Sequence, residues 1–136
     1  MLGTLRRGKA HYEGEADGGV EIMSDLSVTQ PEHVARESFE VGARLLETQL
    51  DVVLDAVTTA LRPLYNETWR EDEEPELDVA AFRAALSVSA MSVTELDNPA
   101  FLVVLYLDCG DLFAGHAVEV MLERDGRLFG NPGLVG

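Results

Sequence analysis

A long helical pattern between two strand-like regions is the feature that most constrains how this chain can fold. From Leu46 to Leu64 the apolar residues are three or four positions apart, while Glu47, Asp51 and Asp55 fall between them. Apolar residues at this spacing share one face of a helix, and the acidic residues lie off that face. The pattern therefore predicts an amphipathic helix that packs on a core.

The start and the length of this helix set a second constraint. The segment Thr29-Gln30-Pro31-Glu32 matches a capping box with proline in the first turn. A straight helix from Pro31 to Leu61 would be about 46 Å long, whereas a compact domain of this size has a radius of gyration of only about 14 Å. We therefore expect a helix that projects, or one that is kinked or broken. Gly42 is the expected weak point, and Pro63 is expected to stop or kink the helix near Leu61.

The N-terminal region is predicted to form strands. Short β-prone stretches between Gly3 and Asp25 are separated by glycines, which predicts two or three strands. Asp17-Gly18-Gly19 indicates a hairpin, because aspartate and glycine tolerate the positive φ of tight turns.

The C-terminal region returns to a strand pattern. Ser87 to Thr94 alternates loosely, whereas Phe101 to Leu107 is apolar throughout and suits a strand buried on both faces. Gly115 to Glu123 alternates cleanly, which predicts a strand with one wet face; Val118, Val120 and Leu122 lie on one face, and Glu119, Met121 and Glu123 on the other. Asp125-Gly126 predicts a hairpin turn into a short strand near 127–129, and Asn131-Pro132-Gly133 predicts another turn.

An acidic segment separates the long helix from these strands. Glu67 to Asp78 holds seven acidic residues and one arginine, which is typical of a solvated, partly mobile linker. Asp78 is expected to cap a short helix over 79–86.

Strands, then helices, then strands predict an α+β fold. We expect a mostly antiparallel sheet packed on one face by the long, kinked or broken helix, with a second short helix. The length of 136 residues fits a single domain over 1–136, and 46% hydrophobic residues supply a core.

Composition excludes several classes of protein. With 25 acidic and 10 basic residues, the formal net charge is −15, so the chain is not expected to bind nucleic acid. One cysteine precludes an internal disulfide. No apolar run approaches the ~20 residues that span a bilayer, and the basic N-terminus is not followed by the apolar stretch of a signal peptide. We expect a soluble cytoplasmic protein that does not bind membranes.

Residues 108–116 contain the densest group of reactive side chains. Asp111, His116 and Cys109 could supply zinc ligands, or Cys109 could act as a nucleophile with His116 as its base. Asp108 and Asp111 disfavour the thiolate, and the spacing matches no known ligand pattern, so a turn with an inert thiol is the favoured interpretation. Nucleotide, P-loop, hydrolase and calcium-binding motifs do not occur, and we predict no cofactor.

Aromatic residues near the acidic segment suggest a different role. Tyr65 and Trp69 are four positions apart and would share a helix face beside the carboxylates. Core packing is the commoner explanation, but tryptophan and tyrosine are also enriched at the centres of protein interfaces. The binding residues that we predict are Tyr65, Trp69, Glu71, Asp72, Glu73, Glu74, Asp111, Phe113 and His116.

Several phrases of the sequence, taken together, resemble a group of small bacterial families of unknown function. The phrases are Gly3-x-Leu5, Tyr12-Glu13-Gly14, Glu21-Ile22, Tyr65-Asn66-Glu67-Thr68-Trp69, Cys109-Gly110-Asp111-Leu112-Phe113-x-Gly115-His116 and Leu134-x-Gly136. The resemblance implies an intracellular bacterial α+β domain, and some related families are thought to be immunity or accessory proteins of toxin systems. It brings no catalytic residues to this chain.

These observations support three hypotheses. The first is a non-catalytic acidic domain that binds a basic protein partner and is immunity-like or accessory in role. The alternative is a metal-binding protein or metal-dependent enzyme that uses Asp111 and His116. The third is a structural homodimer that associates through a sheet edge or the long helix.

Overall fold

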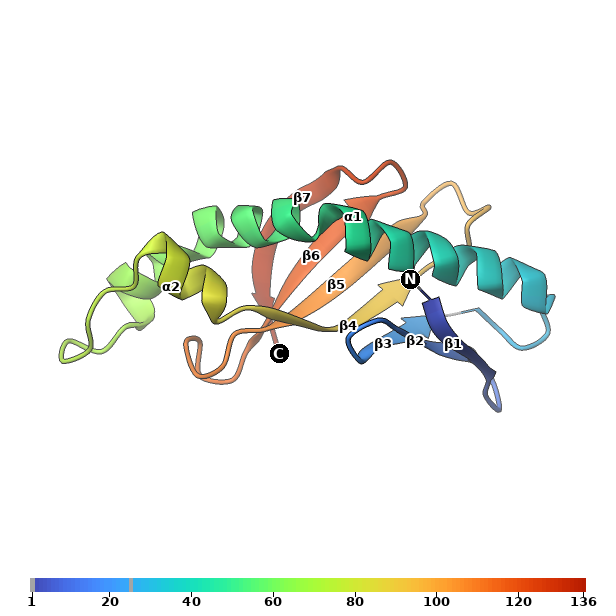
Figure 1. The fold of residues 1–136 in the computed structure, drawn as a ribbon, viewed down its shortest axis with the longest axis horizontal. Helices are drawn as coiled ribbons and strands as arrows, with labels where there is room; N and C mark the ends of the chain where they lie inside the picture. Colours follow the sequence, from blue (N-terminus) through green and yellow to red (C-terminus); the bar gives the residue numbers. More distant parts are fainter. Residues whose placement is uncertain (1, 25) are drawn as a thin grey trace.

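One long helix crosses one face of a twisted sheet (Figure 1). The structure is a computed structural model and describes residues 2–24 and 26–136. In this part of the chain seven strands form a single sheet: β1 (Leu2–Arg7), β2 (Tyr12–Ala16), β3 (Val20–Ser24), β4 (Ser87–Val93), β5 (Leu102–Asp108), β6 (Ala117–Glu123) and β7 (Leu128–Val135).

The strands lie in the sheet in their order along the chain. Neighbours are antiparallel, except that β3 and β4 are parallel, in the described residues. The parallel pair follows from the connection, since β3 and β4 are joined through the helical segment rather than by a hairpin. The predicted α+β fold with a mostly antiparallel sheet is confirmed.

The long helix α1 (Glu32–Leu64) is not broken at Gly42. Gly42 is buried and faces β4 and β5, and a Cβ at this position would lie 2.6 Å from the Cγ1 atom of Val93. The prediction of a weak point was therefore wrong. The glycine allows the helix to approach the sheet closely. The irregularity comes at the other end, where α1 continues past Pro63 into the π-helical turn η1 (Tyr65–Trp69).

The predicted capping box does not form. The helix begins at Glu32, so Pro31 occupies the cap position, and its side chain has no oxygen to accept a hydrogen bond. The Thr29 hydroxyl instead donates to the Ser27 hydroxyl at 3.0 Å.

The C-terminal end of α1 projects past the sheet and is covered by the short helix α2 (Val79–Ala84) (Figure 1). The predicted cap of α2 is confirmed, because the Asp78 carboxylate accepts a hydrogen bond from the Ala81 N–H at 2.7 Å. Arg83 of α2 forms ion pairs with Asp51 and Asp55 of α1. The contacts with α2 thus cover the part of α1 that extends beyond the sheet.

The two faces of the sheet differ. In β5 the side chains of Val103, Leu105 and Leu107 are fully buried under α1, whereas the alternate residues are only half-buried. The expectation that this strand is buried on both faces was wrong, because helices cover one face only. The strand with one wet face, β6, is confirmed, with Val118, Val120 and Leu122 in the core.

The predicted turn at 131–133 lies inside a strand. β7 runs from Leu128 to Val135 and pairs with β6, but the register shifts between Glu119 and Met121. Gly130, with φ of +72°, starts the bulge that absorbs the extra residues.

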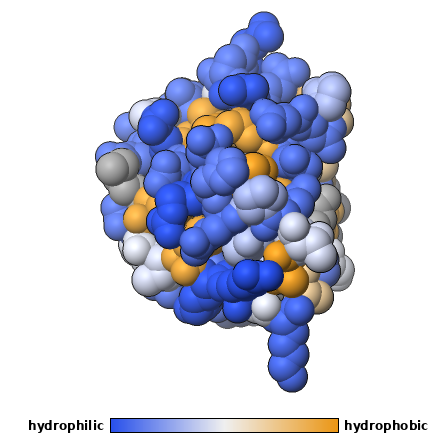
Figure 2. Space-filling model, turned by 90° about the vertical axis from the view of Figure 1, so that its right-hand side faces the viewer, coloured by the Kyte–Doolittle hydropathy of each residue, from blue (hydrophilic) through white to orange (hydrophobic). Residues whose placement is uncertain are grey.

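The end of the molecule where α1 begins is mostly hydrophilic, with apolar side chains in separate patches (Figure 2). Among the described residues no helix is both long and apolar enough to cross a membrane.

Candidate functional site: a tryptophan beside an acidic loop

An aromatic cluster lies where the end of α1 meets α2 and the loop that joins β5 to β6. Phe113 of this loop is fully buried, and the rings of Tyr65, Trp69 and Phe82 have their centroids 6.0, 5.6 and 6.3 Å from its own. All three pairs are edge-to-face, a geometry that aromatic rings favour. The cluster anchors the projecting end of α1 to the rest of the molecule.

The π-helical turn sets the position of Trp69. The Arg70 N–H donates to the Tyr65 carbonyl at 2.7 Å, which closes a turn wider than that of an α-helix. Pro63 lies just before this turn and lacks the N–H that an α-helix needs. Residues four apart share a face in this wider turn, so Tyr65 and Trp69 both contact Phe113.

The loop between β5 and β6 is held by short-range hydrogen bonds. The Asp108 carboxylate accepts from the Gly110 N–H at 2.8 Å, and the His116 N–H donates to the Phe113 carbonyl at 3.0 Å. Gly110 has φ of +61°. This loop turns Phe113 inward and places the His116 ring 5.8 Å from that of Trp69.

The acidic segment is an ordered loop tied to the end of the helix. The Asn66 amide exchanges two hydrogen bonds with the backbone of Leu77, at 3.0 and 2.9 Å. Arg70 donates to the Glu74 carbonyl at 2.6 Å and lies 3.7 Å from the Glu76 carboxylate. The loop that follows Trp69 in the chain is thus held to the end of the helix by Asn66 and Arg70.

Within this loop the four predicted acidic residues have different surroundings. Glu74 accepts a hydrogen bond from the Tyr65 hydroxyl at 3.3 Å. Burial of Tyr65, and then this bond to a carboxylate, raise the pKa of the phenol. Glu71, Asp72 and Glu73 are exposed to solvent. Three carboxylates are therefore available to a partner, and the fourth helps to hold the loop.

Trp69 is the aromatic residue of the cluster that solvent reaches. It is 36% exposed, whereas Tyr65, Phe82 and Phe113 are buried. Its ring packs against two others, so its position is fixed by the fold. An ordered, partly exposed tryptophan beside free carboxylates has the properties of an interface anchor.

Cys109 is not arranged as a nucleophile. Its side chain is buried, and its thiol donates to the His116 carbonyl at 3.4 Å rather than facing the imidazole. Burial, and then the charge of Asp108, raise the pKa of the thiol.

We expect the Cys109 thiol to be unreactive in the folded protein. In native buffer an aromatic disulfide reagent should react at least about 100-fold more slowly than in denaturant, because the thiol must first be exposed by local opening. Absorbance at pH 7 measures both rates. A native rate close to the denatured one would contradict the burial of Cys109.

The metal hypothesis gains no support. Across residues 2–24 and 26–136, no three histidine, cysteine or acidic side chains gather closely enough to hold a metal ion. Asp111 lies exposed in the turn, and Cys109 is bonded to the backbone.

The structure brings together Tyr65, Trp69, Phe113, His116 and Glu74, and places Glu71, Asp72 and Glu73 on the adjoining loop. Sequence reasoning missed Phe82, Asn66 and Arg70. Phe82 is predicted on the apolar face of the short helix, but its contact with Phe113 has no local signal in the sequence. The roles of Asn66 and Arg70 depend on contacts between residues that are distant or irregular in the chain.

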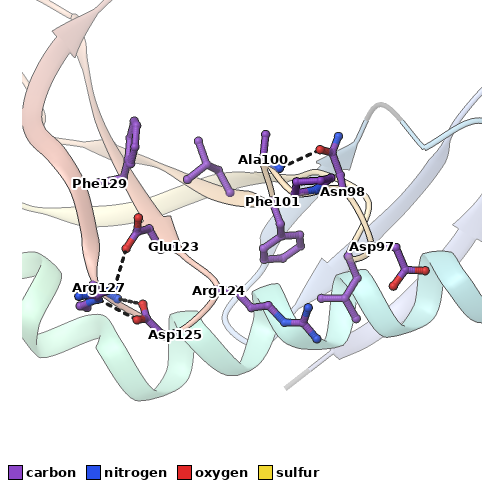
Figure 3. A pocket seen from close by; sticks show the side chains of 12 residues that line it. Asp97, Asn98, Ala100, Phe101, Glu123, Arg124, Asp125, Arg127 and Phe129 are labelled. Carbon is purple, nitrogen blue, oxygen red and sulfur yellow. Dashed lines mark hydrogen bonds and ion pairs between the residues drawn. The ribbon is translucent and has the colours of Figure 1, made fainter.

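A separate hollow of about 610 Å³ lies away from this cluster, between the β4–β5 loop and the β6–β7 hairpin (Figure 3). Phe101, Glu123, Arg124 and Phe129 are among the residues that line it. Arg127 is engaged by Asp125 at 2.7 Å and by Glu123 at 3.6 Å. No catalytic arrangement is evident in this set of side chains.

The fold and site define a small α+β protein whose most distinctive surface is an anchored tryptophan beside an acidic loop. The chain belongs to the family described as "uncharacterized protein conserved in bacteria", DUF2262, whose model matches residues 1–130. This confirms the resemblance to a bacterial family of unknown function. Comparison with curated proteins and with solved structures finds no significant match.

Proposed function

We propose that this protein is a non-catalytic binding domain that recognises a basic protein through Trp69 and the acidic loop, in an immunity-like or accessory role. The observation that carries the proposal is that Trp69 is 36% exposed although its ring packs against Phe113 and His116. The exposed residues Glu71, Asp72 and Glu73 follow it in the chain. The indole offers apolar area, and the carboxylates offer complementary charge to lysine and arginine.

Charge supports the choice of a basic partner. The chain has a formal net charge of −15, so a basic protein is attracted before contact and an acidic one is repelled. The nearby side chains that could suggest catalysis are engaged in structural contacts. The Cys109 thiol is buried, and the Glu74 carboxylate accepts a hydrogen bond from the Tyr65 hydroxyl.

The test is a pull-down from a lysate of the native host at low and moderate salt, followed by mass spectrometry. We expect one near-stoichiometric basic protein, with an association rate that falls as ionic strength rises. The triple variant Glu71→Gln, Asp72→Asn, Glu73→Gln should weaken its capture at least about tenfold, and Trp69→Ala should do the same.

A matched control separates location from total charge. Glu32→Gln, Glu37→Gln, Glu40→Gln removes the same number of charges from exposed positions at the start of α1. This control should retain the partner. If both triple variants lose it equally, the acidic loop is not the recognition surface, and if no basic protein is captured at either salt, the proposal fails.

A further inference from the structure

The face of the sheet that α1 does not cover carries a row of aligned side chains. The strand registers pair Met23 with Ser92, Ser92 with Val104, Val104 with Met121, and Met121 with Phe129. These five residues therefore form one line across β3 to β7, which we call the open-face row. Apart from Ser92, the side chains of the row are apolar.

The row is accessible to solvent. Met23 is 46% exposed and Phe129 is 53% exposed, while Val104 and Met121 are half-buried. Leu102 and Tyr106, two positions before and after Val104 on β5, share its face and are half-buried too. The face of a sheet that contacts water normally carries polar side chains. The apolar side chains of this exposed face are therefore unusual, and they are typical of an interaction surface.

Carboxylates flank the row on the same face. Glu21 and Glu119 belong to the neighbouring line of paired residues. Glu123 lies opposite Leu102 and is ion-paired with Arg127 at 3.6 Å. Glu13 and Glu15 extend this charge onto β2, where Arg6 lies 3.8 Å from Glu13. The surface is thus apolar in its centre and mainly acidic at its border.

The hollow in Figure 3 continues this surface at one end. Leu102, Glu123 and Phe129 belong both to the open face and to the lining of the hollow. A side chain that enters the hollow would therefore lie next to the end of the row.

We infer that the open face is a second docking surface, for a basic protein that presents apolar side chains between lysines and arginines. Charge complementarity selects this occupant. A second copy of the chain would bring Glu21, Glu119 and Glu123 against the same carboxylates, and an anionic membrane or nucleic acid would be repelled in the same way. This inference does not depend on the Trp69 surface, which lies with the helical layer.

The test uses a synthetic peptide that alternates lysine with leucine, titrated into isotopically labelled protein and followed by NMR amide shifts. We expect the shifts to gather on β3 to β7 around the open-face row. A peptide that alternates glutamate with leucine should cause none.

Variants then assign the surface. Val104→Thr, Met121→Thr, Phe129→Thr keeps residues suited to strands and should weaken peptide affinity at least about tenfold. Val52→Thr should leave the affinity unchanged, because it removes a similarly exposed apolar side chain from α1, outside both proposed surfaces. If the triple variant does not fold, Phe129→Thr alone should still weaken binding, since its side chain is mostly exposed.

Three outcomes would overturn the inference. Shifts confined to Trp69 and the acidic loop would assign the peptide to the first surface. Unchanged affinity in the folded open-face variants would show that the row is not used. A dimer of the unliganded protein that dissociates on Phe129→Thr, measured by sedimentation, would identify a second copy as the occupant.

Discussion

Phe113→Ala is expected to lower the free energy of unfolding by about 3–5 kcal/mol, the range found when a buried phenylalanine is truncated in a core. Phe113 is fully buried, and the rings of Tyr65, Trp69 and Phe82 pack against it edge to face. Its loss would leave a cavity where three separate segments meet, and these segments cannot all move inward together. Denaturant titration, followed by circular dichroism, measures the change.

Phe129→Ala is the matched control for this prediction. It removes the same atoms from a side chain that is 53% exposed, so its cost should be much smaller, within about 1 kcal/mol. The fluorescence of Trp69, the single tryptophan, should change in Phe113→Ala and stay constant in Phe129→Ala. Equal costs for the two variants would show that the aromatic cluster does not stabilise the fold.

The main elements of the fold follow from local pattern. The helical period from Leu46 to Leu64 identifies α1, and Leu46, Val53, Val57 and Leu61 are indeed buried. Leu50 and Leu64 are more than a third exposed, because a helix that crosses a sheet obliquely cannot bury a whole stripe along its length. The alternation in β6 and the cap at Asp78 were predicted for the same reason, since each depends on neighbours in the chain.

The features that were missed depend on the third dimension. Pattern alone does not show that one face of β5 is left uncovered, because a run of apolar residues is compatible with either arrangement. The residues of the bulge in β7, Asn131-Pro132-Gly133, are of the types that also form turns. Only the pairing of β7 with β6 shows that they lie within a strand.

Part of the candidate site was accessible from spacing. Tyr65 and Trp69 are four positions apart and do share a face, since both rings pack against Phe113. The predicted neighbouring carboxylate is found at Tyr65, whose hydroxyl donates to Glu74. The contact of the two rings with Phe113 joins segments more than 40 residues apart, and the sequence contains no local signal for it. The order of the acidic loop was equally hidden, since it rests on Asn66 and Arg70. The binding role of these residues stays a prediction.

Gly42→Val is expected to lower the free energy of unfolding by about 3 kcal/mol, the upper part of the range for overpacked cores. A Cβ on Gly42 would lie 2.6 Å from the Val93 Cγ1 atom and 3.3 Å from the Met91 Sδ atom. The branched side chain would force α1 away from β4. Valine is a better helix former than glycine by only a few tenths of a kcal/mol, so the steric cost decides the sign. Thermal and denaturant unfolding of the variant measure it.

Two alanine variants test whether Gly42 is needed for close packing of α1 on the sheet or for flexibility of the helix. In Gly42→Ala the gain in helix propensity, about 1 kcal/mol, opposes the clash with Val93, so we expect a smaller net loss than for valine. In the double variant Gly42→Ala, Val93→Ala the clash is removed. Val93→Ala should therefore lower the free energy of unfolding by at least about 1 kcal/mol less in the Gly42→Ala background than in the wild-type protein. If Gly42→Ala stabilises the protein on its own, the helix does not approach the sheet as closely as 2.6 Å implies. If both variants lose stability additively, the loss comes from elsewhere than the contact between Gly42 and Val93.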